Sequence, residues 1–259
     1  MKRSIYYSVI MFVLTFTISA QNETMYIMKN GLVIGKYNVN NQVDSVIFYQ
    51  PSNSFIDSRD GNIYNTVTIG TQVWMVENLR YLPSVVGPGT DSNTTPYYYV
   101  SGYNGTNVTA AKATSNYTTY GVLYNWPAAM AGSASSSANP SGVQGICPSG
   151  WHLPSDAEWT QLTSYLGGED LAGSKLKEMG ITHWTSPNAD ATNESGFSAL
   201  GGGARNWDGT FLNIGSQEFW WSATEGAHAW FRFVSYSYGG VGKGDGGKNM
   251  GFYVRCVRD

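Results

Sequence analysis

Residues 145–154 read GICPSGWHLP, and residues 251–259 read GFYVRCVRD. Each stretch carries one cysteine, Cys147 or Cys256, and the chain of 259 residues has no other. Two cysteines allow only one intramolecular pairing. A disulfide between them would close a loop of about 110 residues, for which the chain-entropy model gives about 4–5 kcal/mol of stability. Two separate buried thiols are the alternative. A catalytic thiol is disfavoured because no histidine motif accompanies either cysteine.

The start of the chain predicts export, which would permit that disulfide. The start is basic (Met1-Lys2-Arg3), residues 4–18 are apolar and uncharged, and Ile18-Ser19-Ala20 forms a cleavage site before Gln21. We therefore expect residues 1–20 to be a signal peptide and the protein to be secreted or held at the cell surface. A transmembrane anchor is the alternative, but the apolar run is short for a span of about 20 residues. A lipid anchor is not expected, because no cysteine lies near the cleavage point.

The composition narrows the class of partner. The net charge is −3, charged residues make up 13% of the chain, and no Lys/Arg cluster is present, so we expect no nucleic-acid partner. Aromatic residues reach 14%, and the chain has 31 glycines. This balance is typical of a loop-rich extracellular fold with a core of large rings and with Tyr and Trp available for binding. We expect a surface-associated rather than a membrane-spanning protein.

A small β unit and a linker are predicted for residues 21–54. Apolar runs at 25–28 and 32–34 flank Asn30-Gly31, the strongest short signal for a hairpin, and a third run follows at 43–49. A Pro/Ser/Asn linker then leads to a boundary near residue 55. The main domain should therefore cover residues 55–259.

The first half of the main domain is predicted to combine one hairpin, long loops and one helix. The expected elements are a hairpin at 63–75, polar loops at 84–118, a helix at 119–130 that Pro127 either kinks or restarts, and a small-residue loop at 131–145.

The second half opens with the clearest helix signal in the chain. Ser155 and Glu158 form a capping box, apolar residues follow on one helical face, and Gly167-Gly168 ends the helix. The remaining expected elements are a second helix at 172–179, a turn at 201–203, and strands at 196–200, 219–222, 229–234 and 251–257.

Several ordered motifs resemble one family. These motifs are 66–70, 72–74, 77–79, 121–126, 147–154, 156–159, 193–197, 220–225 and 251–256. From about residue 61 to residue 259 the chain resembles the FISUMP family, the Fibrobacter succinogenes major paralogous domain. The resemblance implies an α+β fold of the C-type-lectin-like kind, similar to formylglycine-generating enzymes, with two helices, small antiparallel sheets and long loops. Members are mostly secreted or surface proteins regarded as adhesive. Residues 25–49 resemble a short leader of secreted Bacteroidetes proteins.

The residues argue against an enzyme. Formylglycine-generating enzymes use a redox-active cysteine pair, whereas both cysteines here stand in framework motifs. The three histidines, His152, His183 and His228, are scattered without metal-ligand spacing, and His152 is expected to be a packed framework residue. A degenerate relative of the formylglycine-generating class is the enzymatic alternative.

No cofactor or metal is expected. The chain lacks the Glu-Pro-Asn or Gln-Pro-Asp and Trp-Asn-Asp triplets of calcium lectins. Residues 186–190 and 193–194 offer oxygen ligands in a loop. A solvated polar loop is the favoured interpretation there, and a structural calcium ion is the alternative. Residues 207–209, Trp-Asp-Gly, are interpreted as a turn that carries a packed Trp.

The segment 226–249 is the least framework-like part of the domain. Its repertoire is narrow: Gly, Ala, Val, Ser, Tyr, Phe, His and Asp recur, and each can be reached from an Asn codon by changing adenines at its first two positions. This pattern is expected of a diversity-generating retroelement, whose variable proteins also use the C-type-lectin-like fold. An ordinary Gly/Tyr-rich hairpin and loop is the other interpretation. The candidate ligand-binding residues are His228, Trp230, Phe231, Phe233, Ser235, Tyr236, Tyr238, Lys243 and Asp245.

Alternation within this segment predicts two faces. In a strand, Phe231, Phe233, Ser235, Ser237 and Gly239 would share one face, and the other face would carry Arg232, Val234, Tyr236 and Tyr238. One face should pack and the other should be available, and rigid rings beside small neighbours are typical of a binding surface. The sequence therefore predicts an exported, non-enzymatic protein that binds a protein or glycan ligand through this segment. A structural surface or fimbrial component is the alternative.

Overall fold

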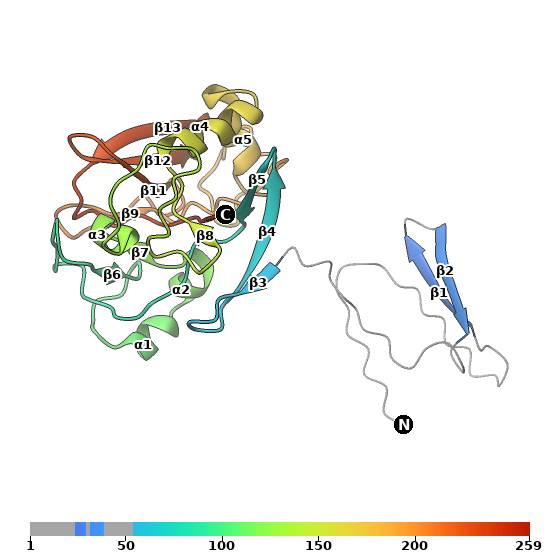
Figure 1. The fold of residues 1–259 in the computed structure, drawn as a ribbon, viewed down its shortest axis with the longest axis horizontal. Helices are drawn as coiled ribbons and strands as arrows, with labels where there is room; N and C mark the ends of the chain where they lie inside the picture. Colours follow the sequence, from blue (N-terminus) through green and yellow to red (C-terminus); the bar gives the residue numbers. More distant parts are fainter. Residues whose placement is uncertain (1–23, 30–31, 39–53) are drawn as a thin grey trace. The chain divides into compact units, whose positions relative to one another are not determined.

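A computed structural model describes residues 24–29, 32–38 and 54–259 (Figure 1). The chain divides into two compact units, Met1–Pro51 and Ser52–Asp259. In the first unit, strand β1 (Thr24–Lys29) pairs antiparallel with β2 (Leu32–Asn38), and Lys29 stands opposite Leu32. The hairpin predicted around Asn30-Gly31 is confirmed. The signal peptide, the third run at 43–49 and the linker fall outside the described residues.

A five-stranded antiparallel sheet forms one side of the second unit, in the order β3-β4-β5-β14-β8. Its strands are β3 (Ser54–Ile56), β4 (Ile63–Ile69), β5 (Gln72–Met75), β8 (Trp151–His152) and β14 (Val257–Arg258). The predicted hairpin at 63–75 is confirmed as β4 and β5. The strand latest in sequence, β14, lies between β5 and β8, and Figure 1 shows the C terminus beside them.

A three-stranded meander forms a second sheet, in the order β11-β12-β13. Its strands are β11 (Gln217–Glu225), β12 (Ala229–Ser235) and β13 (Tyr238–Gly246). Helices α4 (Asp156–Tyr165) and α5 (Glu169–Leu176) pack on this sheet, α5 mainly on β13 (Figure 1). At the outer edge of β11, Trp220 forms a parallel bridge with Tyr253. The C-terminal motif therefore also pairs with the edge of this sheet.

Capping residues explain where helices α4 and α5 begin and where α4 ends. The Ser155 hydroxyl accepts from the Glu158 amide, and the Glu158 carboxylate accepts from the Ser155 amide, which confirms the capping box at the start of α4. Gly167 and Gly168 both have left-handed φ values, 105° and 102°, and end α4 as predicted. The second helix begins at Glu169 rather than at 172, because Gly168 already serves as its N-cap, and it stops at Leu176 instead of 179.

A continuous helix at 119–130 is wrong, but the alternative in which Pro127 restarts a helix is confirmed. Helix α2 (Ser115–Tyr120) ends at Gly121, whose φ of 85° breaks the helix. Strand β7 (Leu123–Tyr124) follows, and Asn125 then caps a separate helix α3 (Trp126–Met130) with Pro127 in its first turn. Within 84–118, predicted as loops, a further helix α1 (Val108–Lys112) is present, started by the Asn107 side chain, together with the short strand β6 (Tyr98–Tyr99).

Small antiparallel pairs and five short helices in residues 54–259 confirm the α+β class, although the family resemblance implied only two helices. Strands β9 (Ala204–Arg205) and β10 (Phe211–Leu212) form one such pair. The strand predicted at 196–200 is reduced to a single bridge at Ala199, and 251–257 makes bridges before β14. The loop at 131–145 is confirmed, whereas the turn predicted at 201–203 is not formed, and Gly203 instead bridges in parallel to Glu218 of β11.

Large rings fill the core, as the composition predicts. Seven of the nine Trp residues are between 0 and 7% exposed. Trp207 is 65% exposed, so the prediction that it packs is wrong. Its turn meets the rest of the domain through Gly209, where a Cβ atom would lie 2.7 Å from the Pro88 carbonyl oxygen.

Candidate functional site

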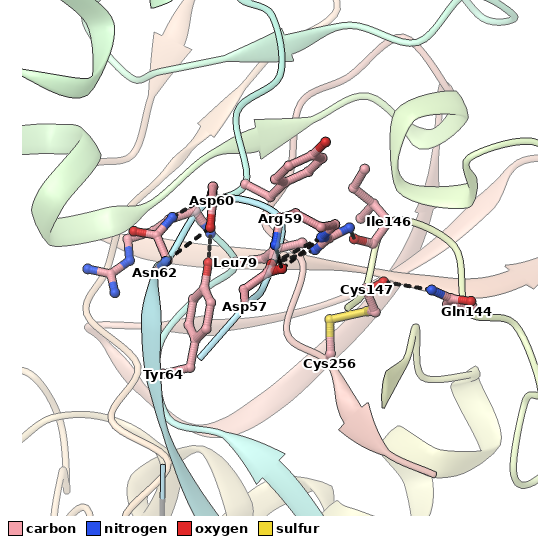
Figure 2. Close-up of polar contacts among 12 residues, drawn as sticks. Asp57, Arg59, Asp60, Asn62, Tyr64, Leu79, Gln144, Ile146, Cys147 and Cys256 are labelled. Atoms are coloured by element: carbon pink, nitrogen blue, oxygen red, sulfur yellow. Dashed lines mark hydrogen bonds and ion pairs between the residues drawn. A yellow bond between two sulfur atoms is a disulfide. The ribbon is translucent and has the colours of Figure 1, made fainter. Parts of the chain in front are cut away.

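The two cysteines form the predicted disulfide, and both are fully buried (Figure 2). The strands that follow the two cysteines, β8 and β14, pair with each other through Trp151 and Arg258. Two stretches 109 residues apart are therefore joined twice, by a covalent bond and by a strand pair.

A loop after β3 supports this junction (Figure 2). Arg59 forms an ion pair with Asp57 at 2.7 Å and donates a hydrogen bond to the Ile146 carbonyl at 2.8 Å. Its guanidinium also lies 4.0 Å from the ring centroid of Tyr81. Because Ile146 precedes Cys147, the start of the unit is fixed to the same junction.

A second buried group joins three of the family-like motifs, 77–79, 220–225 and 251–256, through Glu218. Asn78 donates to the Glu218 carboxylate at 2.6 Å and accepts from the Trp220 indole at 2.9 Å and from Arg255 at 3.1 Å. Glu218 and Arg255 lie 3.9 Å apart and are 0 and 1% exposed. The carboxylate also accepts from the Leu200 and Gly201 amides. Each polar group is satisfied, as a buried network requires.

Burial dominates the ionisation of this pair. It lowers the pKa of Arg255 to about 10, although the charge of Glu218 acts in the opposite direction. Burial also raises the pKa of Glu218 above its usual value, although Arg255 and Asn78 oppose this. The network is therefore a structural feature whose charges are costly to separate.

His152 is a framework residue, as predicted. Its Nε2 lies 2.7 Å from Glu158 and its Nδ1 lies 2.7 Å from Asp259. Burial by itself would lower the pKa of His152, but the contacts with Glu158 and Asp259 outweigh burial and raise it. His183 and His228 pair with separate carboxylates, Glu178 and Asp245. The three histidines therefore form no common site.

The candidate segment 226–249 is mostly the β12-β13 hairpin, and alternation divides its side chains between two faces. One face of β12 carries Trp230, Arg232 and Val234, opposite Asp245, Lys243 and Val241 of β13. The other carries Phe231 and Phe233, opposite Gly244 and Gly242. The predicted parity holds to Ser235. After Ser235 the predicted alternation of faces no longer applies, because the strand register shifts and Tyr236-Ser237 form the turn that leads into β13.

The phenylalanine face packs against glycine. A Cβ atom on Gly242 would lie 2.2 Å from the ring of Phe233, and one on Gly244 would lie 2.7 Å from the ring of Phe231. Rings from β12 therefore cover the bare backbone of β13, a known way of protecting strand glycines. Phe219 stacks on Phe233 with centroids 5.5 Å apart, which ties this face to the core.

The other face is locked at its centre by Arg232, whose side chain is fully buried. Its guanidinium donates to Asp156 at 2.8 Å, to Glu169 at 2.5 Å and to Thr160 at 2.8 Å. Asp156 and Glu169 stand in the first turns of α4 and α5, where acidic groups also favour the helix dipole. Arg232 thus fastens both helices to β12.

The outer end of this face is uncovered. Four of the nine predicted residues gather there: His228, Trp230, Lys243 and Asp245, which we name the display surface. The Lys243 ammonium lies 4.9 Å from the Trp230 ring centroid, and His228 lies 3.2 Å from Asp245. The side chains of His228, Asp245 and Lys243 are 61, 47 and 42% exposed. Asp156 borders the group, 3.7 Å from the Lys243 nitrogen.

The other five predicted residues lie elsewhere. Phe231, Phe233 and Ser235 belong to the opposite side of the hairpin. Tyr236 lies in the turn, where its backbone bonds to Ser216 and Ala189. Tyr238 is 48% exposed and donates to Asp170 on α5 at 2.6 Å.

A buried lysine that the sequence did not single out holds this turn. The Lys177 ammonium donates to the carbonyls of Ala189, Ser235 and Tyr238 at 2.8, 2.8 and 2.9 Å. Burial lowers the pKa of Lys177 to about 8, and the nearby charge of Asp190 partly opposes this. No pattern in the sequence could have shown this role, because all three partners are backbone oxygens distant in the chain.

The loop that offered calcium ligands makes other contacts. The Asn188 amide donates to the carbonyls of Glu178 and Gly180, and Asn193 pairs with Ser198. The ammonium of Lys177 bonds the Ala189 carbonyl in the same loop. Within the part of the chain that the structure describes, no three His, Cys, Asp or Glu side chains gather in a metal-binding arrangement.

Comparison with family models identifies the scaffold. The model of the Fibrobacter succinogenes major domain matches residues 67–258. The chain belongs to this family. Searches among curated proteins and among solved structures gave no match. The matched range contains both cysteines, the Glu218–Arg255 network and the display surface. None of the helices in the described residues is long and apolar enough to span a membrane.

Proposed function

We propose that this member of the Fibrobacter succinogenes major domain family is an exported adhesion or ligand-binding protein with a C-type-lectin-like fold. The observation that carries the proposal is the display surface. An indole, an ammonium and a His–Asp pair gather on the uncovered end of a sheet whose centre Arg232 holds rigid. Aromatic and charged groups on a rigid support are the usual anchors of binding. The signal-peptide pattern and the disulfide support export to an oxidising compartment.

We further propose that the protein is not an enzyme. Both cysteines are joined to each other in the core, which leaves neither as a free thiol for catalysis. The display surface has the chemistry of a protein- or glycan-binding platform: a ring for stacking and flanking charges for orientation. It needs no cofactor.

Binding assays with the purified full chain test the proposal. Glycan arrays and whole-cell binding would compare the wild type with Trp230→Ala and Lys243→Ala, and with Tyr165→Ala as a control at an exposed ring outside the display surface. We expect the first two to lose binding at an unchanged melting temperature and the control to retain it. Retained binding in both display-surface variants would refute this site. Self-assembly without ligand binding would support a structural surface component instead.

Diversification of the segment by a retroelement is a second proposal, supported by its narrow repertoire. Packing restricts it, because Cβ atoms at Gly242 and Gly244 would collide with rings. Of the display-surface positions, 228 and 245 carry residues that an Asn codon can give in this way, so variation on this surface should concentrate there. Sequencing the genomic locus tests this: a near-copy rich in Asn codons beside a reverse transcriptase gene is expected, and the absence of both would refute it.

A further inference from the structure

Trp207 differs from every other tryptophan in the domain. Seven are between 0 and 7% exposed and Trp230 is half-buried beneath Lys243, whereas Trp207 is 65% exposed. Its indole nitrogen has no hydrogen-bond partner among residues 54–259. A ring of this size left in water is a frequent mark of a binding site, since Trp is enriched among the residues that dominate binding energy.

The turn that carries Trp207 is rigid. The Asn206 amide donates to the Thr210 carbonyl at 2.8 Å, and the Gly209 amide donates to the Asn206 carbonyl at 3.0 Å. The Asp208 carboxylate accepts from both the amide and the hydroxyl of Thr210, at 2.9 and 2.7 Å. Gly209, with a φ of 88°, sits against the Pro88 carbonyl. The exposed indole is therefore presented on a fixed support and loses little freedom on binding.

The charges around the turn favour a neutral ligand. Hydrogen bonds from Thr210 lower the pKa of Asp208, and the charge of Arg205 lowers it further. Arg205 is itself 1% exposed and donates to the Pro88 carbonyl behind the turn. The carboxylate is therefore favoured in its ionised form, and the buried Arg205 already supplies a positive charge near it. A cationic ligand would meet one open ring rather than the cage of several rings that such ligands need.

We propose that Trp207 and Asp208 form a binding site for a neutral pyranose ring of a glycan. The indole provides a flat apolar surface for the C–H face of the sugar. Only one of the two Asp208 oxygens has a partner among the described residues, so the other can accept from a sugar hydroxyl. This site lies between β9 and β10, whereas the display surface lies on β12 and β13. The proposal therefore does not depend on the proposed function.

Tryptophan fluorescence provides a direct test with the full chain. Acrylamide quenches exposed indoles, so Trp207 should dominate the quenching, and Trp207→Ala should remove most of it. Neutral mono- and disaccharides, including glucose, galactose, mannose and N-acetylglucosamine, would be titrated to about 10 mM, which covers millimolar dissociation constants. We expect a saccharide to protect the wild type from quenching. Asp208→Asn should weaken its binding about tenfold, since a hydrogen bond to a charged group is lost.

Two controls separate this site from other effects. Trp230→Ala alters the display surface, and Tyr165→Ala removes another exposed ring. Both should bind the saccharide as the wild type does. Equal binding by Trp207→Ala would overturn the proposal, and so would no protection by any saccharide. Protection by a lysine-rich peptide in place of a sugar would also overturn it and would indicate a protein-binding site. These outcomes test only the Trp207 site, and the cell-binding assay with Trp230→Ala tests the display surface separately.

Discussion

Charged side chains behave differently in the framework and on the display surface. In the framework, Glu218, Arg255 and His152 are at most 3% exposed, and each has several hydrogen-bond partners from distant parts of the chain. On the display surface, His228 and Asp245 contact each other and water. Arg255 and His152 lie in motifs by which the family is recognised, and Glu218 bonds to Asn78 of another, so those motifs report how the domain is held together. The residues of the proposed display surface lie outside those motifs.

Among changes in the framework, loss of the disulfide should have the largest effect on the free energy of unfolding. Replacing both cysteines, Cys147→Ser with Cys256→Ser, should lower the free energy of unfolding by about 4 kcal/mol, because the unfolded chain regains the entropy of a long loop. Urea denaturation measures this. Reductant should reproduce the loss in the wild type and leave the double variant unchanged. A loss below about 1 kcal/mol would show that the β8-β14 pair alone suffices.

Breaking the buried Glu218–Arg255 network should cause the next largest loss of stability. Arg255→Met leaves the Glu218 carboxylate in the core with its nearest positive charge removed, so we expect a loss of about 3 kcal/mol. Arg258→Met is the matched control, since Arg258 is exposed and its loss should cost less than about 1 kcal/mol. Similar losses in the two variants would contradict the framework role of Arg255. Thermal unfolding followed by circular dichroism distinguishes them.

The packing of rings on β13 predicts a smaller effect. Gly242→Ala places a methyl group against the Phe233 ring and should cost about 2 kcal/mol. A second change, Phe233→Leu, should cost less in the Gly242→Ala background than alone, because the two sites are coupled. Gly89→Ala is the control, since no atom lies within 4 Å of the position that its methyl group would take. Additive effects in the double-mutant cycle would refute this contact.

His152 predicts a pH dependence of modest size. Its pKa is raised in the folded state by Glu158 and Asp259 against the effect of burial, so the folded protein keeps a proton that the unfolded chain releases near pH 6.5. The stability that His152 contributes is complete below that pH and is lost as pH rises through the folded pKa. Urea midpoints from pH 5 to 9 should show this fall in the wild type and a flatter profile in His152→Gln. Identical profiles would rule out this coupling.

Changes on the display surface should have the smallest effect on stability. His228→Ala and Lys243→Ala should each alter the free energy of unfolding by less than about 0.5 kcal/mol, because exposed ion pairs contribute little. A large loss in either variant would place that residue in the framework and remove the contrast between the two regions. The same melting curves serve the binding assays as evidence of folding.

Local chemistry made part of this structure predictable. The capping box at Ser155, the hairpin turn at Gly70 and the pairing of the only two cysteines depend on a few neighbouring residues or on elimination, and the structure agrees. The helix expected at 119–130 failed because Gly121 and the Asn125 cap compete with its periodicity. Alternation correctly separated Phe231 from Arg232.

Tertiary contacts decided what the sequence could not show. Lys177 bonds carbonyls up to 61 residues away, and nothing local marks it. The turn at Tyr236-Ser237 ends the alternation that was extended to Tyr238. Trp207 was expected to pack within its turn but is 65% exposed, because the turn contacts the rest of the domain through Gly209 and Pro88.

The position of β14 has a consequence for how the domain is made. Residues 251–258 bridge to β7, β9 and β11 and then insert between β5 and β8, so nearly every sheet lacks a partner until this segment has been synthesised. Contacts of such long sequence separation form slowly. The five-stranded sheet cannot be completed while residue 257 is still in the ribosome, so the fold is finished only at the end of synthesis. The late arrival of this segment makes completion of the fold a step that follows, rather than accompanies, most of translation.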